Sequence, residues 1–165
     1  MNWYAIKVKY QTERKMKGWL DKQSIECFLP FHNVMVERNG RKIRKDKPIV
    51  PGLLFIRTEQ RTAYALLNEM RTTIIFYRNL ETQQLLIIPD KQMADFMFLL
   101  DFSEVAVQNA NLRQGDRVRV IKGIFAGIEG ELVRVKGHKR VIVRLEGLFS
   151  LATTYIPGAF LERIE

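Results

Sequence analysis

Residues 115–130 read GDRVRVIKGIFAGIEG, and this stretch decides the fold of the C-terminal part of the chain. Within it, residues 117–121 alternate charged and apolar side chains, which is the pattern of a strand with one buried face. Closely spaced glycines follow this strand, namely Gly123, Gly127 and Gly130. Because glycine permits tight turns and close approach of two backbones, the stretch predicts a small, β-rich module.

The neighbouring residues extend the same pattern. Residues 131–136 and 140–145 alternate again across a short turn, and residues 160–164 form a last short strand. Five short strands within residues 113–165 favour a small barrel, because closure removes exposed sheet edges. The preceding residues 102–112 show no clear period, so we interpret them as a linker.

Residues 1–101 switch between strand and helix patterns. The strand at residues 3–9 places Tyr4, Ile6 and Val8 on its core face, and Thr12 is the expected cap of the helix that follows. The order β-α-β-β-α-β is the ferredoxin-like signature, so the sequence predicts an α+β sandwich with two helices on one sheet face. The further expected elements are strands at residues 25–31, 53–56, 74–77 and 85–88 and helices at residues 12–23, 62–70 and 90–100.

A basic segment interrupts this sandwich. The pair Asn39-Gly40 separates residues 34–38 from residues 42–44. Asn-Gly supplies the two positive φ angles of a type I′ turn, so the segment predicts an inserted β-hairpin. The tip and the return strand carry a dense set of cations, namely Arg38, Arg41, Lys42, Arg44, Lys45 and Lys47.

Charge is the strongest signal in the composition. The chain of 165 residues has a formal net charge of +9 and a pI of about 9.8. Residues 1–47 hold 12 Lys and Arg against 5 Asp and Glu, residues 112–165 hold 10 against 6, and residues 48–111 hold 5 against 7. Two basic ends favour a polyanionic partner such as nucleic acid. A basic surface that serves only solubility explains the same charge.

Other classes of function find little support. No apolar run reaches the roughly 18–20 residues of a membrane span, and no signal-peptide pattern opens the chain. Cys27 is the only cysteine, which excludes an internal disulfide and favours a cytoplasmic protein. His32 and His138 fall in different predicted domains, and the sequence offers no metal cluster and no group that would orient a Cys27–His32 pair. No glycine-rich phosphate loop precedes a helix. We therefore predict no enzyme and no cofactor.

Two resemblances cover nearly the whole chain. Residues 115–130 resemble a KOW motif, the signature of a small SH3-like barrel. The N-terminal part is similar to the NGN domain of the NusG family in Trp3-Tyr4, in Leu29-Pro30, in the basic hairpin and in VPGLLFI at residues 50–56. The stretch QSIECFLP at residues 23–30 resembles specialised RfaH-type members, among them Bacteroides-type capsule-locus antiterminators. The resemblance implies an NGN domain at residues 1–101, a linker at 102–112 and a KOW barrel at 113–165.

The resemblance also implies a function. NusG-type proteins are transcription elongation or antitermination factors, and their NGN domain binds the β′ clamp helices of RNA polymerase through an apolar patch on the open sheet face. Here the patch maps to Tyr4, Val50, Pro51, Gly52 and Leu53. Family members usually carry aromatic side chains beside the Pro-Gly pair, whereas this chain has Val50 and Leu53, and core packing explains Leu53 equally well. Tyr64 matches the region of RfaH-type proteins that meets the polymerase β subunit, without the polar motif found there.

The remaining expected sites concern further partners. The hairpin residues Arg38, Arg41, Lys42, Arg44 and Lys45 are candidates for contact with upstream or non-template DNA, and a solvated hairpin without a partner is the alternative. The KOW resemblance implies ribosomal protein uS10 or the Rho factor as a second partner, with candidate contacts at Ile124, Phe125, Ala126, Leu148 and Phe149. Core packing explains Phe125 and Phe149 as well. A ribosome- or RNA-associated KOW protein is the alternative function, and in either case we expect a monomer without membrane contact.

Overall fold

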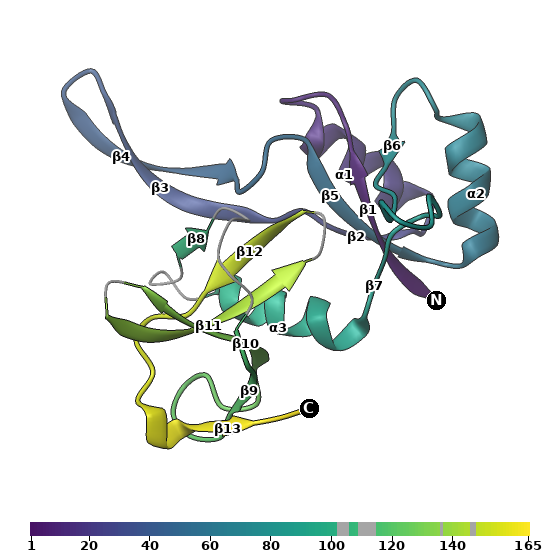
Figure 1. Ribbon diagram of the computed structural model, residues 1–165. Coiled ribbons are helices and arrows are strands. Elements are labelled where there is room, and N and C mark those ends of the chain that lie inside the picture. The colour runs from purple at the N-terminus through teal and green to yellow at the C-terminus, as the bar shows by residue number, and fades with distance from the viewer. Residues whose placement is uncertain (102–105, 109–114, 136, 146–147) are drawn as a thin grey trace. The chain divides into compact units, whose positions relative to one another are not determined.

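The computed structural model describes residues 1–101, 106–108, 115–135, 137–145 and 148–165 (Figure 1). The chain forms two compact units, Met1–Pro89 and Asp90–Glu165, which we describe separately. Among the described residues, no helix is long and apolar enough to cross a membrane. The expected α+β class is confirmed: an α/β region comes first and an antiparallel sheet follows.

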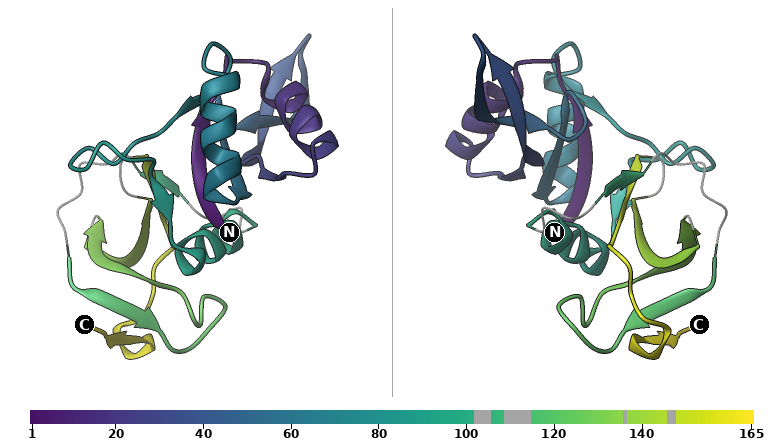
Figure 2. Two further views of the ribbon diagram at one scale, coloured as in Figure 1. Left: turned by 90° about the vertical axis from the view of Figure 1, so that its right-hand side faces the viewer. Right: turned by 90° about the vertical axis from the view of Figure 1, so that its left-hand side faces the viewer.

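The first unit consists of an antiparallel sheet with two helices packed against it. Its sheet has the strand order β2-β5-β1-β6, and β7 also pairs with β1. In Figure 2, α2 runs alongside β1. The strands β3 and β4 form a separate two-stranded ribbon. The elements are β1 (Asn2–Lys7), α1 (Glu13–Lys22), β2 (Glu26–Phe28), β3 (Phe31–Arg38), β4 (Arg41–Pro48), β5 (Leu53–Thr58), α2 (Gln60–Glu69), β6 (Ile75–Phe76) and β7 (Ile87–Ile88).

The core of this unit lies between the sheet and its two helices. Tyr4, Ile6 and Val8 belong to one buried cluster with side chains of both helices, which confirms the core face expected from their alternation. Met16 and Leu20 line this cluster from α1. The helix α2 adds Ala63 and Leu66 to the cluster.

One local expectation is wrong in detail. Thr12 does precede the first residue of α1, but its hydroxyl caps no helical N–H group. The hydroxyl instead donates a hydrogen bond of 2.6 Å to the backbone oxygen of Lys9. A threonine hydroxyl competes for whichever backbone group lies nearest, and here the tight turn before the helix offers that oxygen.

The second unit combines one helix with an antiparallel sheet in the order β13-β9-β10-β11-β12-β8. Val118 and Val120 are buried while Arg117 and Arg119 are exposed, so the expected alternation is confirmed. Closure of this sheet into a barrel stays a prediction. The elements are α3 (Asp90–Leu100), β8 (Ala106–Gln108), β9 (Arg117–Val120), β10 (Glu129–Val135), β11 (His138–Leu145), β12 (Phe149–Ala152), the short 3-10 helix η1 (Gly158–Phe160) and β13 (Leu161–Arg163).

The helix α3 packs within this second unit. The Lys91 ammonium group donates a hydrogen bond of 2.8 Å to the backbone oxygen of Gly127. The buried Asp95 carboxylate pairs with Lys91 at 2.5 Å and accepts the backbone N–H of Glu129 at 3.1 Å. Packing thus divides the chain at residue 90, whereas the sequence places a domain boundary at 101. Most of the expected linker lies outside the described residues, and residues 106–108 within it form β8.

Candidate functional site

The sheet of the first unit has a face that α1 and α2 do not cover. Cross-strand partners share a face, so the pairs Tyr4–Ile56 and Ile6–Leu54 point toward the helices. The pairs between them, such as Ala5–Phe55 and Lys7–Leu53, point away from the helices. We call this second face the open face; it is formed by Trp3, Ala5, Lys7, Glu26, Phe28, Leu53, Phe55, Arg57, Ile75 and Ile88.

The structure separates two residues that the sequence grouped in one patch. Tyr4 is 1% exposed, lies on the helix side and packs edge-on against Phe76 with ring centroids 6.2 Å apart. Leu53 lies on the open face and is fully buried. Its neighbour on that face, Phe55, stacks on Phe28 with ring centroids 6.4 Å apart. The alternation of β1, which already put Tyr4 on the core side, was the signal for this separation.

The Pro-Gly turn is held rigidly against the rest of the unit. Gly52 has a φ of +79°, and a Cβ atom there would lie 2.4 Å from the backbone oxygen of Val8. The N–H of Val8 donates to the Gly52 oxygen at 2.8 Å, and the Gly52 N–H donates to the buried Glu13 carboxylate at 2.9 Å. Next to this anchor, Pro51 is exposed and Val50 is half-buried. The turn therefore fixes where β5 begins on the open face.

Tyr64 lies apart from the open face. It sits on α2, whose Ala63 and Leu66 point into the core, and its side chain is 38% exposed. Because α2 covers the opposite side of the sheet, Tyr64 does not join Leu53 in one patch. The two positions define separate candidate contacts.

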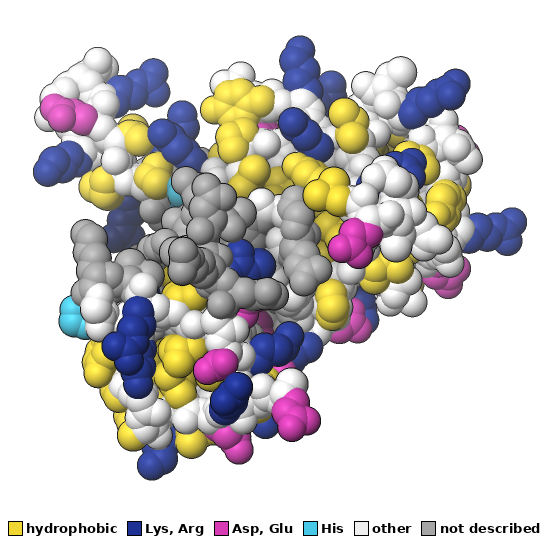
Figure 3. Space-filling model, in the orientation of Figure 1, with side chains coloured by type: hydrophobic (Ala, Val, Ile, Leu, Met, Phe, Trp, Pro, Cys, Tyr) yellow, Lys and Arg dark blue, Asp and Glu magenta, His cyan; other side chains and the backbone are white. Residues whose placement is uncertain are grey.

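The expected hairpin is confirmed. The strands β3 and β4 pair from Phe31 opposite Pro48 to Arg38 opposite Arg41, and Asn39 and Gly40 between them have φ angles of 52° and 74°. The ribbon extends away from the sheet of the first unit, and Lys and Arg side chains project from it (Figures 1 and 3). All five predicted contact residues are exposed: Arg38, Arg41, Lys42, Arg44 and Lys45.

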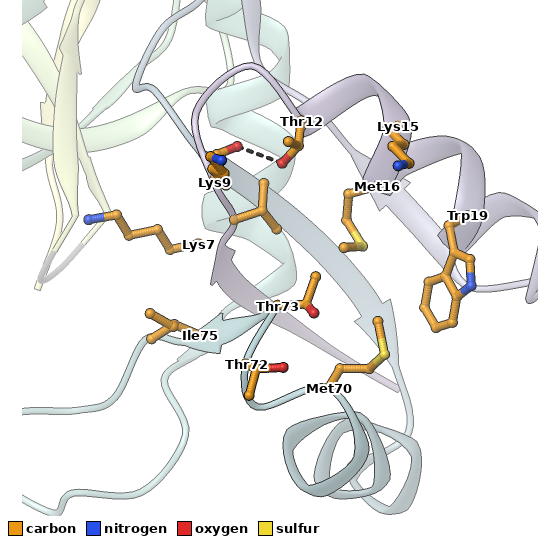
Figure 4. A pocket seen from close by; sticks show the side chains of 11 residues that line it. Lys7, Lys9, Thr12, Lys15, Met16, Trp19, Met70, Thr72, Thr73 and Ile75 are labelled. Carbon is orange, nitrogen blue, oxygen red and sulfur yellow. Dashed lines mark hydrogen bonds between the residues drawn. The ribbon is translucent and has the colours of Figure 1, made fainter.

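A basic pocket of about 610 Å³ in the first unit was not expected from the sequence (Figure 4). Its apolar wall is formed by Met16, Trp19 and Met70, with Val8 and Ile75 nearby. Three ammonium groups and three threonines complete the lining, namely Lys7, Lys9, Lys15, Thr12, Thr72 and Thr73. None of the lining residues is acidic. The pocket thus offers cations and hydroxyls beside an indole ring, which suits an anionic ligand with a flat apolar part, such as an unpaired nucleotide.

The sequence does not predict this pocket, because its lining comes from three separate segments. One segment, residues 7–9, starts at the last residue of β1, and a second, residues 12–19, covers the start of α1. The third, residues 70–75, runs from the end of α2 to the first residue of β6. Only the tertiary fold brings these segments together. The sole signal along the chain was the alternation of lysines with apolar residues at the end of the first strand.

The expected partner site of the second unit divides into buried and exposed parts. Ile124 is 64% exposed and Ala126 is exposed, while Phe125 is 4% exposed and belongs to the core. Leu148 is half-buried, and the side chain of Phe149 lies outside the described residues. A small cavity of about 130 Å³ next to Ile124 is also lined by Tyr155.

The titratable groups give no support to covalent chemistry. Burial raises the pKa of the Cys27 thiol to about 12, so the reactive thiolate is scarce at neutral pH. Within the described part of the chain, no three His, Cys, Asp or Glu side chains gather in a way that could hold a metal ion.

A comparison with protein-family models decides the family. Residues 1–97 match the NusG model, described as "Transcription termination factor nusG". The chain belongs to the NusG family. NusG proteins are transcription factors that bind RNA polymerase, and they are not enzymes.

Two further comparisons add little to the NusG assignment. A search of curated proteins found no match. Crystal structures of the MjSpt4:Spt5 complex in conformations A and B align over 98% of this chain and 97% and 96% of theirs, with 15% and 16% identity and TM-scores of 0.27 and 0.26. Because the TM-scores are this low, we draw no conclusion about the fold or function of this protein from these alignments.

Proposed function

We propose that this NusG-family protein binds the β′ clamp helices of RNA polymerase through the open face of its first unit and suppresses pausing or termination. The observation that carries the proposal is the family match over residues 1–97 together with an open face rich in apolar side chains. Ile75 is 62% exposed, and its burial against a partner helix contributes to the affinity. Because the factor favours the elongating state by binding it better than the paused state, no covalent step is needed.

The open face revises the roles of individual residues in this proposal. Leu53 and Phe55 are 0% exposed and support this face from below its surface, whereas Ile75 is its accessible apolar side chain. The Pro51-Gly52 turn fixes the start of their strand. Tyr4 acts from the opposite side of the sheet by packing against Phe76, so it supports the contact without making it. Tyr64, on α2, is assigned to a separate contact with the polymerase.

The second unit is proposed to close into a KOW barrel that recruits a second partner such as ribosomal protein uS10. Support comes from the exposed Ile124 and Ala126 on the loop after β9. An RfaH-like specialisation is part of the same proposal and rests on residues 23–30. The alternative is a ribosome- or RNA-associated protein that uses the same basic surfaces.

A binding assay with matched variants tests the polymerase contact. Ile75 is 62% exposed and pairs with Lys7 on the open face, whereas Ile87 is 48% exposed and pairs with Tyr4 on the other face. We expect Ile75→Glu to abolish capture of core polymerase free of nucleic acid and Ile87→Glu to leave it unchanged. Equal capture of both variants overturns the open-face contact. Failure of the unaltered protein to capture polymerase, with co-sedimentation on ribosomal subunits instead, overturns the function in favour of the alternative.

We also infer that the basic pocket receives an unpaired base of a single nucleic-acid strand. The indole ring of Trp19 provides a stacking surface, and Lys9 and Lys15 neutralise the neighbouring phosphates. Quenching of Trp19 fluorescence by a single-stranded oligonucleotide tests the contact, since the other tryptophan, Trp3, is 6% exposed. Absence of quenching at a saturating concentration refutes it.

A further inference from the structure

The two faces of the β3–β4 hairpin differ sharply in charge. Directly opposed residues of an antiparallel ribbon share a face, so the register sorts every side chain. We call one side the cationic face; it holds His32, Val34, Val36, Arg38, Arg41, Ile43, Lys45 and Lys47. The other side, the balanced face, holds Phe31, Asn33, Met35, Glu37, Lys42, Arg44, Asp46 and Pro48.

Only the cationic face is left with uncompensated charge. It carries four Lys and Arg side chains and no acid, whereas the balanced face carries two of each sign. On the balanced face Glu37 stands directly opposite Lys42. On the cationic face Arg38 stands directly opposite Arg41, a like-charge pair that destabilises a ribbon in the absence of an anion. An anionic partner relieves this repulsion.

The cationic face also has a spacing that suits a duplex. Arg41 near the tip and Lys45 in the middle of β4 are four residues apart, which corresponds to about 14 Å along a strand. The major groove of B-DNA is about 12 Å wide. Cations at the tip and in the middle of the hairpin can therefore meet phosphates on the two sides of a groove, with the apolar side chains of Val36 and Ile43 between them.

The base of the balanced face is occupied by contacts within the first unit. The guanidinium group of Arg14 on α1 lies 4.6 Å from the centre of the Phe31 ring. The same group pairs with Asp46 at 3.7 Å. These contacts hold the base of the balanced face against α1, next to a cavity that Lys45 and Lys47 also line.

We propose that the hairpin binds duplex DNA through the cationic face alone and straddles a groove. Arg38, Arg41, Lys45 and Lys47 contact phosphates, whereas Lys42 and Arg44 do not. Phosphate contacts position a protein without reading sequence, so this binding is independent of base sequence. The inference rests on the proposed function because it assigns the DNA contact of the transcription factor to one surface.

A pair of charge-matched variants of the full chain tests the assignment. Arg38→Gln with Lys45→Gln removes one Arg and one Lys from the cationic face, and Arg44→Gln with Lys42→Gln removes the same charges from the balanced face. Each is titrated onto a labelled random-sequence duplex of about three helical turns. Fluorescence anisotropy between about 50 and 200 mM salt gives the dependence of log K on log salt. Circular dichroism confirms that both variants fold.

The two variants have different expected outcomes. Loss of two phosphate contacts lowers the magnitude of the salt slope by about 1.8 and weakens binding at 100 mM salt by about tenfold or more. The balanced-face variant retains the slope of the unaltered protein. Equal losses overturn the proposal, because they show that the hairpin acts only through its total charge. Face-dependent binding to a single strand of the same sequence, but not to the duplex, overturns the assignment of a duplex partner.

The outcome for the hairpin is separable from that for the polymerase. Both double variants should capture core polymerase as well as the unaltered protein does, since neither change touches the open face. If polymerase capture fails for every form while the face-dependent duplex binding persists, the proposed function is wrong and the hairpin assignment stands.

Discussion

The Pro51-Gly52 turn offers the sharpest test of the structure. Replacing Gly52 by alanine places a Cβ atom 2.4 Å from the backbone oxygen of Val8, far inside van der Waals contact. The obstacle is a backbone atom just after the end of β1, so no side-chain rotation relieves the clash. Either the end of β1 or the whole turn has to move.

Three contributions determine how much Gly52→Ala lowers the free energy of unfolding. A φ of +79° costs an L-residue about 1–2 kcal/mol. The displacement weakens the hydrogen bond from Val8 to Gly52, worth about 1 kcal/mol, and the bond from the Gly52 N–H to the buried Glu13 carboxylate, worth about 1.5–3 kcal/mol. Partial retention of these bonds gives an expected loss of about 3–5 kcal/mol in the free energy of unfolding of the first unit.

Urea unfolding followed by tryptophan fluorescence measures this loss, because Trp3 and Trp19 both lie in the first unit. Gly40 is the matched control: its φ is +74°, but nothing lies within 4 Å of a Cβ atom there. Gly40→Ala should cost only the backbone contribution of about 1–2 kcal/mol. If Gly52→Ala costs no more than Gly40→Ala, the steric argument is refuted.

Four further measurements have expected outcomes. Trp19→Ala weakens binding of a single-stranded oligonucleotide by about 1–3 kcal/mol, measured by anisotropy, because the stacking surface of the pocket is lost. Cys27, with its pKa raised to about 12 by burial, reacts with iodoacetamide at pH 8 far more slowly in the native protein than in urea, as followed by mass spectrometry. Asp95→Asn weakens the contact of α3 with β10 and speeds hydrogen exchange at the Glu129 amide, whose N–H the carboxylate accepts. The hydrogen bond from Arg119 lowers the pKa of Glu129, so its stabilisation is complete above about pH 4.3 and disappears as the pH falls through the folded-state pKa; Glu129→Gln abolishes this part of the acid dependence in thermal melts.

Local patterns predicted much of the fold. The alternation of β1 placed Tyr4 and Ile6 in the core, and the Asn39-Gly40 pair located the hairpin turn. Both features depend on residues a few positions apart, so neighbouring side chains suffice to determine them. The strand of residues 117–120 was predicted for the same reason.

Features that depend on distant segments were not predictable in this way. The open face exists because β1 pairs with β5 in one register, and a shift by one residue would have joined Tyr4 and Leu53 on the same side. Asp95 lies within an apolar helical stripe, and its partner, the amide of Glu129, is 34 positions away. Nothing in the sequence near Asp95 identifies that amide.

The chemistry of the two proposed surfaces explains how weak DNA contacts can hold the hairpin on DNA while polymerase is bound. The open face is mainly apolar, so its affinity for polymerase depends little on salt, whereas phosphate contacts weaken steeply as salt rises. Non-specific DNA binding has dissociation constants of about 10⁻⁴ to 10⁻⁶ M at physiological salt. A surface tethered nearby experiences an effective concentration in the range of about 1 mM, above those constants. In the proposed complex, four phosphate contacts on the cationic face therefore keep the hairpin on DNA while polymerase is bound, and release it once polymerase dissociates.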